Sequence, residues 1–284
     1  MIRLVCVLGH NHEILPHFIE HYSKYVDELN FVIYESEASP RILSRSKPII
    51  AQYDNCKIVK VVRDRVYDWE KVTILYNMIK SKKKNDWWVV ADIDEFHLYP
   101  NNDLNGLISD CENNLWNIVR GGFVDRIGPN GTMPKIKHDE HIFKTFPMAG
   151  FFRYPLSEAC PNKIPLVRGN IEITNGQHYA RIHGQTTWRW QGWYHPEIAP
   201  YKDYSIQVHH FKWDETCVKR IKSVADINQP YAYSKEYFKL YEQLKRSDFL
   251  VNTKNKDYLF LKCEKDDFNQ YKNWDKLIRK IISI

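Results

Sequence analysis

A five-residue apolar run, Trp-Trp-Val-Val-Ala at residues 87–91, leads directly into the acidic residues Asp92, Asp94 and Glu95. A short apolar run that is rich in Val and Trp is typical of a buried strand. The acids therefore follow the point where a central strand leaves the core, and open α/β sheets bind their ligands beyond that end of the strands. This stretch predicts an α/β protein with a polar site at one edge of its sheet.

The spacing of the two aspartates in this stretch predicts that they contribute to the same site. Residues two apart on an extended chain point the same way, so Asp92 and Asp94 are expected to face one site. Hard cations such as Mg²⁺ and Mn²⁺ prefer carboxylate oxygens and usually share them with substrate phosphates. One aspartate can bind the cation while its neighbour orients a ribose or a metal-bound water. The alternative for such a triplet is a strand end with solvated acids.

Strands and helices alternate in the first third of the chain. This alternation predicts parallel β-α-β units with right-handed crossovers, as in a nucleotide-binding half-domain. The apolar periodicity predicts strands at residues 2–8, 29–34, 56–62 and 87–91, with helices at residues 14–25 and 69–80.

The rest of the chain has a different pattern. Residues 115–208 are richer in Gly, Pro and short strand-like pieces, which favours mixed or antiparallel sheet, and after Trp213 the chain turns helical and charged. We expect one domain over residues 1–220 and a helical C-terminal extension over residues 221–284 packed on it. The expected strands are 117–124, 151–154, 171–174 and 205–208, and the expected helices are 215–225, 235–246 and 271–284.

The motif Ala-Asp-Ile-Asp-Glu-Phe at residues 91–96 resembles the D-x-D motif of nucleotide-sugar glycosyltransferases with the GT-A fold, above all the family-2-type branch with a D-I-D-E-F core. Later segments match that branch in order, over about residues 1–220: Val124-Asp125-Arg126, Gly176-Gln177-His178 and His209-His210-Phe211-Lys212-Trp213. The resemblance implies a GT-A fold, which is a Rossmann-like α/β sandwich. It also implies transfer of a sugar from a UDP or GDP sugar to an acceptor hydroxyl on a carbohydrate or glycan, with inversion.

Several residues become candidates for donor binding through this resemblance. Leu8 and Glu13 lie in the first-strand loop, where the family holds an N-E pair that is interrupted here as Asn11-His12-Glu13. Asn11 could instead cap the following helix. The resemblance also implies Glu35 as a ribose contact and Asp92 as a donor contact. By position, Asp64 could accept from a base N–H, Lys71 could reach a phosphate and Lys212 could neutralise the leaving diphosphate. Solvated surface charges are the alternative for Glu35, Asp64 and Lys71.

The resemblance also implies cation ligands and a general base. Asp92 and Asp94 would hold Mn²⁺ or Mg²⁺, completed by His209 or His210. Adjacent strand residues point to opposite faces, so one of the two histidines should bind, and the sequence does not say which. An inverting transfer needs a base for the acceptor proton. Asp125 is the first candidate, although an ion pair with Arg126 would make it poorly basic; His178 and Glu158 are the alternatives.

Composition adds a few expectations. The net charge of +6 suits an anionic donor or an anionic membrane surface and does not indicate nucleic acid, so peripheral membrane contact stays open. The six scattered cysteines indicate reduced, intracellular thiols. Residues 1–9 are too short and too polar for a signal peptide, and no apolar run could span a membrane, so a cytoplasmic protein is expected. The aromatic block at residues 187–195 could wall an acceptor-sugar site or simply be a packed loop.

Two other classes of function remain open from the sequence. A nucleotidyltransferase usually carries a Gly-rich loop and a basic residue after its first strand, and Leu8-Gly9-His10-Asn11 lacks both. A non-catalytic carbohydrate-binding or nucleic-acid-binding protein would also suit the aromatic residues and the positive charge.

Overall fold

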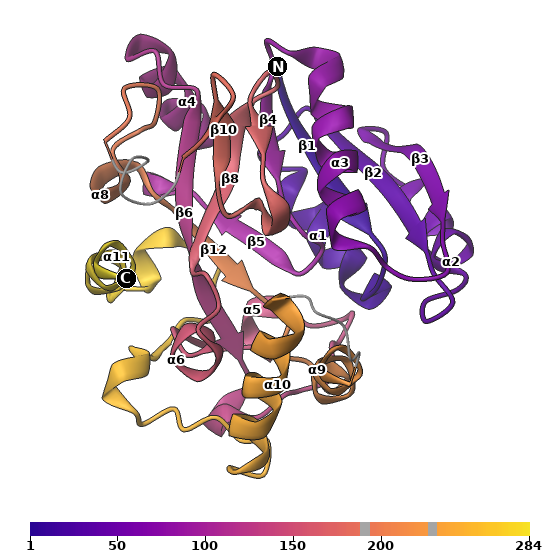
Figure 1. Ribbon diagram of the computed structural model, residues 1–284, viewed down its shortest axis with the longest axis vertical. Helices are drawn as coiled ribbons and strands as arrows, with labels where there is room; N and C mark the ends of the chain where they lie inside the picture. Colours follow the sequence, from indigo (N-terminus) through magenta and orange to yellow (C-terminus); the bar gives the residue numbers. More distant parts are fainter. Residues whose placement is uncertain (188–193, 227–231) are drawn as a thin grey trace. The chain divides into compact units, whose positions relative to one another are not determined.

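The computed structural model describes residues 1–187, 194–226 and 232–284 (Figure 1). The chain divides into two compact units. The first unit contains Met1–Gly122 and Asn162–Val208, and the second contains Phe123–Pro161 and His209–Ile284. This division differs from the expected domains, 1–220 and 221–284, because strand pairing within the second unit joins residues 123–161 to the C-terminal part of the chain.

The first unit is built on a sheet with the strand order β6-β8-β4-β1-β2-β3. The four strands from β4 to β3 are parallel, and β8 is antiparallel to both β4 and β6. The predicted α/β, Rossmann-like fold class is confirmed by this arrangement. The strands are β1 (Ile2–Leu8), β2 (Glu28–Glu35), β3 (Cys56–Arg63), β4 (Trp87–Val90), β8 (Asn162–Arg168) and residues 118–122 of β6 (Ile118–Ile127).

Helices cover both faces of the parallel strands. Helix α3 (Trp69–Lys80) lies against β1 (Figure 1). Its Leu75 and Tyr76 share a buried cluster with Val7 of that strand. Asp68 caps α3 by accepting hydrogen bonds from the backbone N–H groups of residues 70 and 71. Helix α1 (Leu15–Tyr22) covers the other face, since the ring centroid of its Phe18 is 6.1 Å from that of Phe31 in β2. Alternating strand residues therefore serve the two faces.

Shorter elements complete the first unit. A separate three-stranded sheet has the order β11-β10-β9. The strand β12 (Ile206–His210) begins in the first unit and ends in the second. The other elements are η1 (His12–Ile14), α2 (Ile42–Ile50), η2 (Ser81–Lys83), β5 (Glu95–Leu98), η3 (Pro100–Asn102), α4 (Leu104–Asn113), β9 (Glu172–Ile173), η5 (Asn175–Gln177), β10 (Ala180–Ile182), β11 (Gln185–Thr186) and α8 (Tyr201–Tyr204).

The second unit combines a small antiparallel sheet with helices. The strand β7 (Met148–Gly150) pairs with residues 125–127 of β6 and with β13 (Leu261–Lys262). Trp213, Phe152 and Leu240 belong to its buried cluster. The helices are η4 (Pro129–Gly131), α5 (Ile142–Thr145), α6 (Arg153–Ser157), α9 (Cys217–Ala225), α10 (Ala232–Lys245), η6 (Lys256–Tyr258), η7 (Phe268–Gln270) and α11 (Trp274–Ser283).

The expected elements of the first third are confirmed most closely, because β1 and α3 have the predicted bounds. The strand expected at residues 151–154 is wrong, since residues 153–157 form helix α6. The side chain of Asp125 accepts hydrogen bonds from the backbone N–H groups of Phe152 and Arg153, which stabilises the start of that helix. The sequence interpretation did not include α2, α4, β5 or β8.

Two expectations about the chain as a whole can be compared with the structure. Within the described ranges, every helix is too short or too polar to cross a lipid bilayer. The six cysteines all lie in described segments, and none of them forms a disulfide.

Candidate functional site

Loops that follow three of the four parallel strands lie at the carboxyl edge of the sheet in the first unit. They follow β1, β3 and β4, and the loop after β4 carries the acidic motif. The ring of Tyr67, after β3, lies 5.6 Å from the ring of His10, after β1. Because parallel strands place their ligand sites beyond their carboxyl ends, this edge is the candidate functional site.

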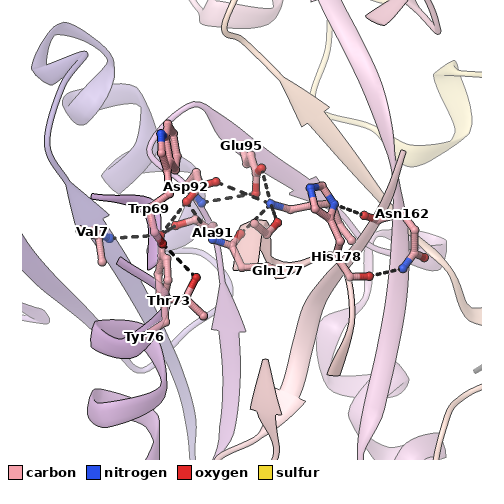
Figure 2. A network of polar contacts seen from close by, with 12 residues as sticks. Val7, Trp69, Thr73, Tyr76, Ala91, Asp92, Glu95, Asn162, Gln177 and His178 are labelled. Atoms are coloured by element: carbon pink, nitrogen blue, oxygen red, sulfur yellow. Dashed lines mark hydrogen bonds and ion pairs between the residues drawn. The ribbon is translucent and has the colours of Figure 1, made fainter. Parts of the chain in front are cut away.

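Asp92 is the best-fixed side chain of the acidic motif. Its Oδ1 atom accepts hydrogen bonds from the Tyr76 hydroxyl at 2.8 Å and from Gln177 Nε2 at 3.0 Å (Figure 2). The Tyr76 oxygen also accepts the backbone N–H of Val7 at 3.3 Å and lies 3.1 Å from the carbonyl oxygen of Ala91. Helix α3, strand β1 and helix η5 therefore fix the orientation of this one carboxylate.

Lys163 lies beside the acidic motif and was missed by sequence reasoning. Its Nζ atom is 2.8 Å from Glu95 Oε1 and 3.6 Å from Asp92 Oδ2. Lys163 and Glu95 are each only 1% exposed, so their ion pair is fully buried. A signal was present in the sequence, because Lys163 opens the otherwise apolar run Ile-Pro-Leu-Val of strand β8.

The protonation of these acids follows from burial and from Lys163. Burial by itself would raise the pKa of Asp92, but the Lys163 ammonium and the hydrogen bonds from Gln177 and Tyr76 lower it, so Asp92 is a carboxylate. Burial raises the pKa of Glu95 above its ordinary value, and the attraction of Lys163 only partly opposes this. Asp92 is thus the more strongly ionised member of the cluster.

The donor set fits a divalent cation that takes few protein ligands. Among the residues that the structure describes, no group of three or more His, Cys, Asp or Glu side chains is arranged to hold a metal. Carboxylate oxygens suit Mg²⁺ and Mn²⁺, which bind through one or two carboxylates plus substrate phosphates. Asp94, which is 7% exposed in the turn between β4 and β5, is the carboxylate beside Asp92 that would hold the cation.

His178 is anchored close to this network. Its Nδ1 atom is 2.8 Å from the carbonyl oxygen of Asn162, and the Asn162 side-chain amide donates back to the carbonyl of His178 (Figure 2). Gly176 has φ 68°, and a Cβ atom there would come within 2.7 Å of the His178 ring. In the neutral imidazole, an Nδ1–H group that donates to this carbonyl leaves Nε2 as the nitrogen that can accept a proton.

The predicted nucleotide contacts at the ends of β2 and β3 are engaged in ion pairs. Asp64 Oδ2 accepts hydrogen bonds from Lys71 Nζ at 2.5 Å and from the Tyr34 hydroxyl at 2.7 Å. The Lys71 hydrogen bond, followed by that of Tyr34, lowers the pKa of Asp64. Glu35 is 3.0 Å from Arg63 Nε and also accepts the backbone N–H of residue 43. The structure therefore brings Asp64 and Lys71 together and gives Glu35 a different partner.

The loop after β1 contains the other two nucleotide candidates. Leu8 is the last residue of β1 and is completely buried. Glu13 belongs to η1, and its side chain is about half exposed beside His12. Asn11 occupies the N-cap position of η1, as its alternative interpretation expected, but it adopts φ 52° and its side chain makes no capping hydrogen bond.

Aromatic rings line the same edge of the sheet, and sequence reasoning missed their arrangement. The Tyr67 ring centroid is 4.9 Å from that of Tyr34 and 5.0 Å from that of Trp69. Gly9 makes room for Tyr67, because a Cβ atom on Gly9 would lie 2.1 Å from the Tyr67 ring. Aromatic faces of this kind can stack on a nucleobase.

Asp125 belongs to the second unit, where both of its carboxylate oxygens are engaged. Oδ2 accepts the backbone N–H groups of Phe152 at 3.0 Å and Arg153 at 2.9 Å, and Oδ1 accepts from Trp213 Nε1 at 3.2 Å. The expected Asp125–Arg126 ion pair is wrong, since the Arg126 guanidinium donates to backbone carbonyls instead. Complete burial and these bonds favour an anchoring role for Asp125.

The other candidates of the second unit have separate surroundings. The His210 ring stacks on Phe123 at 4.8 Å, and its Nδ1 is 3.9 Å from Asp125. The His209 ring lies 5.6 Å from that of Phe143, so the two histidines have different neighbours, as strand alternation predicts. A role for either histidine as a metal ligand stays a prediction.

Lys212 and Glu158 also lie in the second unit. The ammonium of Lys212 donates to the Tyr237 hydroxyl at 2.7 Å. Glu158 is exposed and pairs with Lys239 at 2.6 Å. The aromatic block at residues 187–195 has its three tryptophans, at positions 188, 190 and 193, outside the described residues.

Comparisons with known proteins give limited likenesses. No protein-family model matches the chain, and no curated protein matches it. Among solved structures, the chain is similar to a mannose-6-phosphate isomerase from Helicobacter pylori, with 13% identity and a TM-score of 0.30 over 46% of this chain and 57% of that protein.

Two further structures are similar over more of the chain. One is described as a glucose-1-phosphate thymidylyltransferase from Bacillus anthracis in complex with sucrose, with 9% identity and a TM-score of 0.30 over 98% of this chain and 96% of that one. The other is S. aureus TarS 1-349, with 12% identity and a TM-score of 0.35 over 87% and 71%. Because these identities and TM-scores are low, the proposals below rest on the residues of this chain.

Proposed function

We propose that this protein is a glycosyltransferase that moves a sugar from a nucleotide-diphosphate sugar to an acceptor hydroxyl, with Mn²⁺ or Mg²⁺. The observation that carries this proposal is the convergence, in the first unit, of the acidic motif and the aromatic rings at the carboxyl edge of four parallel strands. This is where open α/β sheets bind nucleotides. The D-I-D-E-F motif adds the resemblance to nucleotide-sugar enzymes.

The donor would be bound by residues of this edge. Tyr67 and Trp69 offer aromatic surface for the base, and the fixed carboxylate of Asp92 can accept hydrogen bonds from a ribose. Lys71 is 41% exposed and can turn from Asp64 toward a phosphate. Asp94 would hold the divalent cation, which when bound supplies stabilisation of the charge on the departing diphosphate.

His178 is the residue that we propose as the general base. Its Nδ1 is oriented by the carbonyl of Asn162, so Nε2 can take the proton of the acceptor hydroxyl as that oxygen attacks the anomeric carbon. The bond between the anomeric carbon and the diphosphate oxygen breaks in the same step, and its electron pair leaves with the diphosphate. Asp125 is less suited, because its oxygens anchor α6 and Trp213.

Calorimetric titration with UDP and Mn²⁺ tests the donor site. Asp94→Asn should abolish metal-dependent UDP binding in a chain that still folds, because the neutral amide is a poor ligand for a hard cation. Asp110→Asn is the matched control, since Asp110 is an exposed aspartate of the same unit, on helix α4. Unchanged UDP affinity in folded Asp94→Asn would contradict the proposal.

A panel of UDP and GDP sugars tests the reaction itself. Metal-dependent release of UDP or GDP from one donor, with the sugar transferred to a glycan or to water, is the expected result. Formation of a nucleotide sugar from a nucleoside triphosphate and a sugar phosphate would indicate a nucleotidyltransferase instead. Glycan binding without any nucleotide affinity would indicate a binding protein.

A further inference from the structure

The polar network of the first unit is organised around the ammonium group of Lys163. Besides Glu95 and Asp92, Lys163 Nζ contacts the Gln177 side-chain oxygen at 2.6 Å and the carbonyl oxygen of Gly176 at 2.9 Å. Gln177 in turn donates a hydrogen bond to Asp92, and His178 is the next residue in the chain (Figure 2). One buried cation on β8 therefore connects the acidic motif to the segment that holds the proposed base.

The charge on Lys163 opposes the binding of a second cation nearby. Its ammonium is 3.6 Å from the Asp92 carboxylate and 2.8 Å from Glu95, so it already offsets negative charge of the acidic motif. Two unit charges at this separation interact more strongly inside a protein than in water, because the effective dielectric constant there is lower. A divalent cation at Asp94 is therefore attracted less strongly by the motif than it would be by three acids without a counter-ion.

We propose that Lys163 is a positioning residue that sets the cation affinity of the acidic motif, so that a divalent cation is held tightly only together with a nucleoside diphosphate. This inference rests on the proposed function, because it assumes that nucleotide and cation share the site. Lys163 reduces the negative charge of the motif, and the hydrogen bonds to Asp92 occupy one of its carboxylate oxygens. The diphosphate supplies the negative charge and oxygen ligands that the cation still needs. Cation and nucleotide binding are therefore strongly coupled.

A purely structural role for Lys163 makes a different prediction. Lys163 would then stabilise the fold by pairing with Glu95, and its removal would lower stability without changing the affinity for Mn²⁺. Under our proposal, its removal uncovers negative charge and raises that affinity. The affinity for Mn²⁺ alone thus separates the two roles.

The experiment is a titration of the full chain with Mn²⁺ alone and with Mn²⁺ in the presence of UDP, at pH 8, followed by electron paramagnetic resonance. For the wild type, we expect UDP to raise the affinity for Mn²⁺ by more than about tenfold, which corresponds to about 1.4 kcal/mol of coupling. Lys163→Met should bind Mn²⁺ alone at least about tenfold more tightly than the wild type does. Unchanged affinity for Mn²⁺ in folded Lys163→Met overturns the proposal.

A matched control is available in the same unit. Lys80 is another buried lysine, and its ammonium donates to the carbonyl oxygen of Ile171 at 2.5 Å. Lys80→Met removes a buried lysine amine, which is partly protonated at pH 8, at a place away from the acidic motif, so its affinity for Mn²⁺ should equal that of the wild type. An equal gain in Lys80→Met and Lys163→Met would show a general charge effect and would also overturn the proposal.

A second variant keeps the proposal testable if Lys163→Met does not fold. Glu95→Gln removes one of the carboxylates that Lys163 neutralises, so the ammonium should repel Mn²⁺ more strongly and weaken its binding in the presence of UDP. Unchanged or tighter binding contradicts the role of Lys163. If the wild type binds no UDP, the proposed function is contradicted. The change in Mn²⁺ affinity caused by Lys163→Met tests the role of Lys163 separately.

Discussion

Each of the two units buries cationic side chains, and Lys163 and Arg126 show two different ways of stabilising them. In the first unit, Lys163 is paired with the carboxyl groups of Glu95 and Asp92. In the second unit, Arg126 is completely buried, donates to the carbonyl oxygens of Phe143 and Cys263, and lies 4.7 Å from the centroid of the Phe143 ring. Its Nε and Nη1 atoms have no hydrogen-bond partner among the described residues.

The comparison distinguishes Lys163, whose charge is part of the proposed site, from Arg126, whose charge is buried within the packed core. Carboxylates around Lys163 belong to the motif that we propose to bind the donor, so the pair is tied to function. Arg126 is surrounded by aromatic rings and backbone dipoles, which stabilise a cation without creating an anionic site. A buried cation therefore has to be interpreted through its partners and not through its burial alone.

Net charge is also divided unequally between the units. The first unit has 20 Lys and Arg residues and 20 Asp and Glu residues, whereas the second has 21 and 15. The whole net charge of +6 thus belongs to the second unit, although the acidic motif lies in the first. The positive charge of the sequence is for this reason not evidence about the donor site itself.

The largest expected effect is on the rate of sugar transfer, and it distinguishes the candidates for the general base in the two units. His178→Ala should lower the rate of sugar transfer by about 10²–10⁴-fold with unchanged donor affinity, the usual worth of general base catalysis. Asp125→Asn should instead lower the free energy of unfolding by about 1–3 kcal/mol, because an anchoring acceptor is lost. Initial-rate kinetics and urea unfolding measure the two effects.

Glu158→Gln serves as the control in that comparison, because Glu158 is exposed and paired with Lys239, and we expect its transfer rate to be unchanged. Loss of transfer in a fully folded Asp125→Asn chain would assign the base to the second unit instead.

The next prediction compares Lys163 with Arg126 directly. Lys163→Met leaves Glu95 and Asp92 without their counter-ion, and we expect a loss of about 3–5 kcal/mol in the free energy of unfolding. Arg126→Met leaves only two carbonyl oxygens without a donor, so the loss should be about 1–2 kcal/mol. Urea unfolding of both variants checks this order, and the double variant Lys163→Met/Glu95→Gln should recover part of the first loss. Equal losses would remove the distinction between the cations.

A smaller change in stability is expected at two glycines that lie under aromatic rings. A Cβ atom would come within 2.1 Å of Tyr67 at Gly9 in the first unit and within 2.3 Å of Phe260 at Gly150 in the second. Alanine at either position should cost about 1–3 kcal/mol of stability through overpacking. Only Gly9→Ala should also weaken UDP binding, because it displaces Tyr67 at the proposed site. Calorimetry with UDP decides this, and weaker binding in Gly150→Ala would contradict it.

The smallest effect is a pH dependence in the first unit. Burial lowers the pKa of Lys80 to about 8, from 10.5. Between these values the unfolded chain binds a proton that the folded chain has released, so the free energy of unfolding rises with pH. We expect a rise of about 1 kcal/mol from pH 8 to pH 9 that is absent in Lys80→Met.

Urea unfolding at the two pH values measures this rise, and Lys82→Met, which removes an exposed lysine of η2, should retain it. Burial lowers the pKa of Arg126 only to about 10, above this range, so Arg126→Met should also retain it. The same rise in Lys80→Met would mean that another group is responsible.

The sequence by itself determined the α/β class and the place of the acidic motif. Local patterns carry this information, since strands β1 and β4 and helix α3 show the apolar periods of buried strands and of a helix. Asp92 and Asp94 could be placed at a strand end for the same reason. Helix α6 was misjudged because its start depends on the Asp125 side chain, which is 27 residues away from Phe152.

Only the tertiary structure decided which groups meet. Lys163 is far from Glu95 in the sequence and reaches it because β8 pairs with β4 in the same sheet. The anchoring of Asp125 and the division into two units likewise depend on contacts across the fold. Local composition records the propensity of each segment, whereas a buried charge finds its partner through the pairing of distant strands, which no local pattern specifies.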